Sequence, residues 1–216
     1  MVVAFCLLWI PYVDLLGGLI AIFGIAYLYF GGRALDESFH RGVVRGALLI
    51  IIGFVVTVVS TLLYVEQVIN AAQTPGETIP QFLSSLQPDL EAFVVGALLA
   101  AVLVSLGYVF LPYGGADEVS RVVLWGAFAV TFGVATIGLV ILWPQIVPAL
   151  NSAVNGGSIN LAPIQALQLE AQELGLLQAV PDLMFAYAYY RIRSRLLSGE
   201  DSPTAPPSSS FGRTSG

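Results

Sequence analysis

The sequence contains no lysine, and it has only one cysteine (Cys6) and one histidine (His40) among its 216 residues. Chemistry that requires a lysine amine, such as a phosphate-binding loop or a Schiff base, is therefore excluded. A lone cysteine cannot form a disulfide within the chain, and together with one histidine it cannot supply an ordinary zinc cage. The motifs GxSxG, HExxH and GxGxxG are also missing. We therefore expect no catalytic residue, no cofactor and no metal site, and a protein that is not an enzyme.

Charge is equally scarce, because charged residues make up 10% of the chain and hydrophobic residues 57%. A soluble domain typically carries about 25% charged residues. The mean hydropathy of +0.85 points the same way. We infer that most of the surface faces the lipid bilayer of a cell membrane. The few basic residues give no basis for nucleic-acid binding.

Five apolar runs have roughly the 20 residues that a helix needs to cross the hydrocarbon core. They predict spanning helices over residues 11–30, 42–65, 93–112, 122–143 and 174–190. The last run is only just long enough and contains Pro181 and Asp182. The expected fold is an all-α, polytopic transmembrane bundle over residues 1–197. Residues 198–216 are rich in Ser, Pro and Gly, so we expect a disordered cytoplasmic tail there.

The arginines predict the orientation, because Lys and Arg collect in cytoplasmic loops near helix ends. If five helices alternate in direction, all eight arginines fall on one side of the membrane: Arg33, Arg41, Arg45, Arg121, Arg191, Arg193, Arg195 and Arg213. The connection over residues 66–91 carries four carboxylates and no base. This pattern predicts a multi-pass protein with its N-terminus outside and its C-terminus in the cytoplasm. It predicts lipid-headgroup anchors at Arg41, Arg45, Arg191, Arg193 and Arg195.

Small residues mark where membrane helices approach one another closely. Gly42, Gly46 and Gly53 share one side of the second predicted span, and Ala129 and Gly133 lie one turn apart in the fourth. We interpret these faces mainly as contacts within the bundle. The alternative is an interface with a membrane-protein partner or with a second copy of the chain.

Ionisable and amide side chains at membrane depth are the candidate functional residues, because a charge there is costly. Asp14 falls within the bilayer if the first helix begins near Val2, and in the first helical turn if it begins at Pro11. Gln168, Gln172 and Asp182 lie close to one stripe of the fifth predicted helix. Such a stripe either lines a wet cavity or bonds to neighbouring helices.

Residues 1–10 are apolar but too short to cross the membrane alone. They are interpreted as an interfacial segment, as an extension of the first helix, or as the remnant of a truncation.

The stretch YLYFGGRALDESFHRGVVRGALLIIIGFVV, residues 27–56, has a Gly-Arg loop followed by His-Arg at a helix start. It resembles a stretch of uncharacterised archaeal multi-span membrane proteins, a resemblance that implies no activity. Two functions follow from the sequence. One is a non-catalytic membrane component or complex subunit; the other is a small transporter or channel with a polar cavity lined by the fifth helix.

Overall fold

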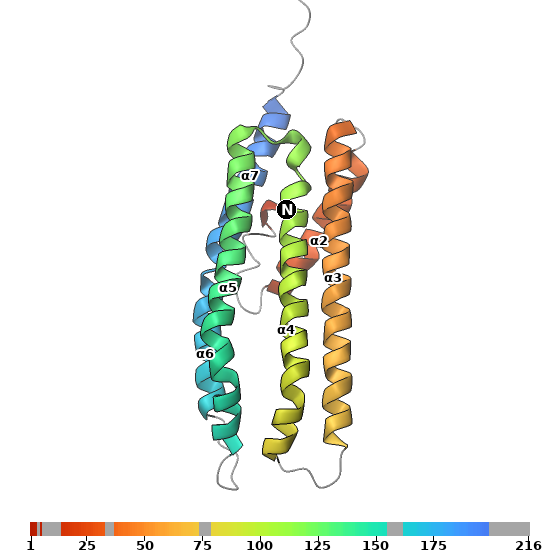
Figure 1. The fold of residues 1–216 in the computed structure, drawn as a ribbon. Coiled ribbons are helices and arrows are strands. Elements are labelled where there is room, and N and C mark those ends of the chain that lie inside the picture. The colour runs from red at the N-terminus through yellow and green to blue at the C-terminus, as the bar shows by residue number, and fades with distance from the viewer. Residues whose placement is uncertain (4, 6–13, 33–36, 74–78, 155–161, 199–216) are drawn as a thin grey trace, which may run out of the picture.

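The long apolar runs form long helices that pack side by side in alternating directions (Figure 1). The computed structural model describes residues 1–3, 5, 14–32, 37–73, 79–154 and 162–198. Within these ranges the elements are α2 (Asp14–Gly32), α3 (Glu37–Ala72), α4 (Ile79–Phe110), the 3-10 turn η1 (Tyr113–Gly115), α5 (Glu118–Val154), α6 (Ala162–Leu176) and α7 (Ala179–Ser198). The described residues contain no strand, and the predicted all-α bundle is confirmed.

Three helices, α3, α4 and α5, are long and apolar enough to cross a membrane. The second and fourth predicted spans lie within α3 and α5, and the third lies within α4 except for its last two residues, 111–112. In α2 the continuous apolar helix is shorter, Ile20–Gly31. The fifth predicted span, residues 174–190, does not lie on one helix, because a turn at 177–178 separates α6 from α7. The count of five crossings therefore stays a prediction.

The interruption between α6 and α7 follows from Pro181, which has no amide hydrogen to donate to the Leu177 carbonyl four residues earlier. That carbonyl instead accepts the amide of Val180 at 3.2 Å. The amide of Gln178 bonds the Gly175 carbonyl at 3.0 Å, another bond of the shorter 3-10 type. A continuous helix through this region was expected. Instead, α6 and α7 lie end to end along α5 (Figure 1).

The closest helix pairing joins α3 to α4 through glycines. A Cβ atom on Gly46 would lie 2.6 Å from the carbonyl oxygen of Gly107 and 2.6 Å from the amide nitrogen of Leu111. Gly42 and Gly53 also face α4 backbone atoms. This confirms that the glycine face of the second predicted span is a contact within the bundle. In α5, by contrast, a Cβ placed on Gly133 has no described atom within 4 Å beyond its own helix backbone.

The buried core lies at one end of the bundle, where α3 and α5 begin and where α4 and α7 finish. It includes Phe39 and Val43 of α3, Leu124 of α5 and Phe185 of α7. Nothing is buried in α6. The exposed side chains along α3 are largely aliphatic, Leu48, Ile51, Val55 and Leu62 among them. Such an apolar exterior suits lipid, because soluble proteins rarely expose large continuous apolar patches.

Phe5 belongs to this core, with 1% of its surface exposed. Its ring stacks on Phe185 at 5.2 Å and meets the edge of Tyr108 at 4.9 Å between centroids. Met1 is half-buried and packs against Gly24 of α2, so these N-terminal residues lie against the bundle (Figure 1). Neither the interfacial segment nor the helix extension expected for residues 1–10 placed Phe5 in the core. The sequence signal was weak because an apolar residue suits lipid and a protein interior equally well.

Two further expectations lie outside the described residues: the disordered tail, except for Ser198 at the end of α7, and the positions of Arg33 and Arg213. The structure describes α2 from Asp14 onward but not the side chain of Asp14. Both interpretations of that carboxylate therefore stay open.

Candidate functional site

Basic charge is confined to one end of the bundle within the described residues, whereas carboxylates lie at both ends. All six arginines in the described residues lie at the end that holds the core, because α3 and α5 begin there and α7 ends there (Figure 1). They are Arg41, Arg45, Arg121, Arg191, Arg193 and Arg195. The opposite end carries Glu66, Asp89, Glu91, Glu170 and Glu173 and, within the described residues, no basic side chain. We call these the arginine end and the carboxylate end.

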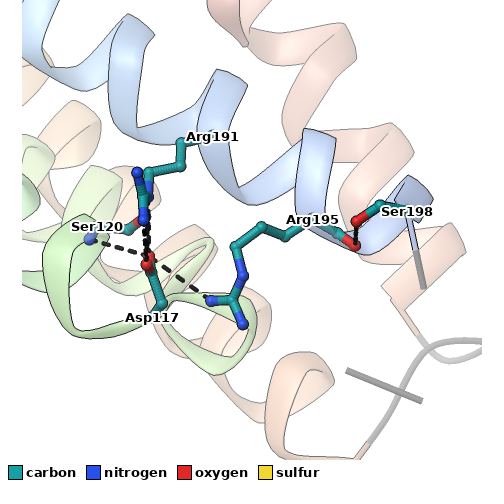
Figure 2. Close-up of polar contacts among 5 residues, drawn as sticks. All are labelled: Asp117, Ser120, Arg191, Arg195 and Ser198. Carbon is teal, nitrogen blue, oxygen red and sulfur yellow. Dashed lines mark hydrogen bonds and ion pairs between the residues drawn. The ribbon is translucent and has the colours of Figure 1, made fainter. Parts of the chain in front are cut away.

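An ion-pair cluster at the arginine end joins α5 to α7 (Figure 2). Asp117 precedes α5 and accepts the amide of Ser120 at 3.0 Å, which caps the helix N-terminus. Its carboxylate also accepts hydrogen bonds from Arg191, from Nη2 at 2.8 Å and from Nε at 3.2 Å. Nη1 of Arg195 lies 3.7 Å from the same carboxylate. One carboxylate thus fixes the start of α5 against the last turns of α7.

The cluster perturbs the proton affinity of its members. Hydrogen bonds from Arg191, followed by those from Ser120, hold the pKa of Asp117 well below its usual range. The same hydrogen bond to Asp117 raises the pKa of Arg191. Both shifts favour the charged forms, so the pair stays ionised at neutral pH. With a carboxylate that does not exchange protons near neutral pH, the cluster suits a structural role better than acid–base catalysis.

The predicted headgroup anchors divide into two groups. Arg41, Arg45 and Arg193 are exposed, as an anchor requires, and Arg41 only approaches the exposed Glu37 at 3.6 Å. Arg191 and Arg195 instead bind Asp117, so their part in the structure is an ion pair between helices. Sequence reasoning missed Asp117. The signal available was its position as an Asp immediately before the acidic first turn of a helix.

The predicted polar stripe of the fifth helix does not form one site. Gln168 and Gln172 are exposed on α6, whereas Asp182 is 6% exposed on α7, beyond the turn. Glu170 of α6 faces α5, where its carboxylate accepts a hydrogen bond from the Gln145 side chain at 3.1 Å. The expected arrangement of these residues along one helix is therefore wrong, because the helix is interrupted between them.

Asp182 lies beside the aromatic core. Gln178, one turn earlier, is a side-chain hydrogen-bond partner of its carboxylate, and Tyr108 of α4 lies close enough to interact with it electrostatically. The hydroxyl of Tyr189 donates to the Tyr108 carbonyl at 2.8 Å and so ties α7 to α4. Asp182 is thus a buried carboxylate with a local partner, as buried polar groups generally are.

Metal-binding chemistry has no support in the part of the chain that the structure describes, where no three His, Cys, Asp or Glu residues are grouped as ligands. Comparisons with known protein families, with curated proteins and with solved structures find no match to this chain.

The Asp117 cluster makes stability depend on pH in a defined direction. Because the folded pKa lies below the unfolded value, its contribution is present above about pH 4 and is lost as the pH falls toward the folded pKa. At pH 7 we expect Asp117→Asn to lower the Tm of the purified protein by about 2–4 °C. This difference should shrink as the pH falls from about 5 to about 3, as thermal unfolding in detergent would record. Glu37→Gln, which removes a carboxylate from an exposed pair at the same end, should not shift the Tm. A difference between Asp117→Asn and the parent that grew on acidification would contradict the assignment.

Proposed function

We propose that this chain is a multi-pass protein of the cell membrane and a non-catalytic component of a membrane assembly, with its arginine end in the cytoplasm. The observation that carries the proposal is the segregation of basic charge along a bundle whose sides are apolar. Basic residues near helix ends favour the cytoplasmic side. The carboxylate end then forms the outer surface.

Five crossings are compatible with the lengths of the helices. The 19 residues of α2 extend for about 28 Å at ~1.5 Å per residue, close to the ~30 Å of a hydrocarbon core. Placed end to end beside α5, α6 and α7 together supply a second additional crossing (Figure 1). With these two, the chain crosses five times in alternating directions and keeps the described arginines at one end.

Small residues of α5 that no other described helix covers favour a role in assembly over catalysis. The glycine face of α3 is consumed within the bundle, but an added Cβ atom on Gly133 of α5 would meet no described atom within 4 Å beyond its own helix backbone, and Ala129, one turn earlier, is exposed. A surface of small residues permits close approach of another helix. It is available to a membrane-protein partner or to a second copy of the chain.

A second candidate function, ion or proton transport, is favoured by one observation, the buried carboxylate of Asp182. Intramembrane carboxylates commonly mark ion or proton pathways. The exposed Gln168 and Gln172 do not extend such a pathway, since they lie on the other side of the turn.

Single cysteines placed in a Cys6→Ser background test the proposal. With a membrane-impermeant maleimide on intact cells, Glu91→Cys should label, and Arg193→Cys should label only after permeabilisation. Asp182→Cys should resist the reagent in both conditions. Labelling of Arg193→Cys on intact cells would overturn the orientation, and labelling of Asp182→Cys would favour the transport function.

A further inference from the structure

A half-open cavity of about 200 Å³ lies between α3 and α4 near the carboxylate end. Its polar lining comes from Ser60 and Gln67 of α3 and from Asp89 of α4, and its aromatic lining from Tyr64 and Phe93. It is several times larger than the ~30 Å³ that one water molecule occupies, so it has room for a small organic group. Neither the ion-pair cluster nor the buried core contributes to it.

The charge in this cavity belongs to Asp89, which is partly buried. No Lys, Arg or His occurs anywhere between Gly46 and Ser120, so neither helix supplies a basic side chain to this end. The arginines of the described residues are at the far end of the bundle. A cation from outside the chain is therefore the natural counterion for this carboxylate.

The aromatic pair specifies what kind of cation. The rings of Tyr64 and Phe93 lie 5.2 Å apart with an angle of 32° between their planes, on the same cavity as Asp89. Ring faces attract ammonium groups within about 6 Å of the ring centroid, and the attraction grows as water is removed. Calcium, by comparison, takes about 6–8 oxygen ligands. One carboxylate beside two rings therefore suits an organic ammonium better than a metal ion.

The position of the cavity relative to the predicted spans adds a further argument. The second predicted span ends at residue 65 and the third begins at 93, so the cavity straddles their outer boundary. Its aromatic side chains lie at that boundary, while Gln67 and Asp89 lie just beyond it. We propose that this cavity binds an organic ammonium group, carried either by a zwitterionic lipid headgroup or by a free amine.

Native mass spectrometry of the full-length protein in a neutral maltoside detergent tests the lipid source. The protein is mixed with equal amounts of phosphatidylethanolamine, phosphatidylcholine and phosphatidylglycerol that have identical acyl chains. We expect retention of the two ammonium lipids over phosphatidylglycerol, and Asp89→Asn should reduce that retention about fivefold, or ~1 kcal/mol. Glu66→Gln removes another carboxylate of the same end, one that does not line the cavity, and it should leave retention unchanged.

The free-amine source is tested by the Tm of the same protein in tetramethylammonium chloride against sodium chloride of equal ionic strength. A higher Tm in the ammonium salt, absent from Asp89→Asn and from Tyr64→Leu, assigns the site to a soluble amine. Equal retention of phosphatidylglycerol excludes the lipid source. The proposal is overturned if neither source shows a preference, or if Asp89→Asn and Glu66→Gln behave alike in both measurements. The lipid measurement rests on the proposed membrane location, but the salt measurement does not, so the two proposals can fail separately.

Discussion

Replacing Gly46 with alanine is expected to destabilise the bundle by about 1–3 kcal/mol, as overpacking of a tight contact does. The added methyl group would meet the Gly107 carbonyl oxygen and the Leu111 amide nitrogen, each at 2.6 Å. These are backbone atoms, so neither can rotate away as a side chain would. Relief requires α3 and α4 to separate, and that loosens the most extensive helix contact of the fold. Thermal unfolding of the purified protein in detergent should show a Tm lower by roughly 2–12 °C.

The same substitution at Gly133 is the matched control. Beyond the backbone of its own helix, no described atom lies within 4 Å of a Cβ at that position. Alanine forms helix more readily than glycine by about 1 kcal/mol, so Gly133→Ala should leave the Tm unchanged or raise it. One chemical change is thus expected to act in opposite directions at two helical glycines. Equal effects at the two positions would show that α3 and α4 do not approach closely at Gly46.

The glycine contact also shows how far sequence reasoning reaches. The spacing of Gly42, Gly46 and Gly53 predicted a packing face, because small residues on one side of a membrane helix allow another helix backbone to approach closely. The partner surface could not be predicted. Gly96, Ala100 and Gly107 share the face of α4 that meets α3. The same run carries a second stripe of small residues, Ala97, Ala101 and Ser105, and the sequence alone does not say which stripe faces α3 or how far α4 slides along it. Periodicity describes one helix at a time, whereas the offset between two helices is set by packing.

Prediction from the sequence reached a similar limit for the charged residues. The side of the membrane predicted for each arginine followed from chain order alone, and the structure gathers the described ones at one end. Chain order did not predict which arginines would be exposed anchors and which would pair with a carboxylate on another helix. Arg193 is exposed, while Arg191 two residues away meets Asp117, 74 residues earlier in the sequence. Which of these two arginines forms the ion pair is decided by how α7 packs against the start of α5.

The two prolines Pro88 and Pro181 have different effects on their helices. Pro88 lies inside α4, which runs without interruption from Ile79 to Phe110. Pro181 sits where α6 gives way to α7. Each proline lacks the amide hydrogen that would otherwise bond to the carbonyl four residues earlier in a helix. The second lies near Gly175, a residue that disfavours helix, and the shorter 3-10 bonds at 174–180 take over there. The consequence of a proline thus depends on whether its neighbours offer another hydrogen-bonding pattern.

Truncating Phe5 to alanine is expected to have the largest effect of any single side-chain deletion in this fold. Its ring is 1% exposed and contacts Tyr108, Phe185 and Tyr189, so it joins the N-terminal segment to both α4 and α7. Removing a buried phenylalanine typically costs about 3–5 kcal/mol, because a cavity is left behind. For a chain of this size, that corresponds to a Tm lower by roughly 6–20 °C. Thermal unfolding in detergent measures it directly.

The matched control is Phe23→Ala, which deletes the same ring from α2, where it is 74% exposed. In detergent or lipid this side chain leaves one apolar environment for another, so we expect little change in Tm. A small effect for both variants would mean that the N-terminal segment lies on the membrane surface instead of in the core. A large effect for Phe5 alone would establish that residues before the first spanning helix complete the bundle. The contacts that close the interior at the arginine end would then depend on a segment too short to cross the membrane by itself.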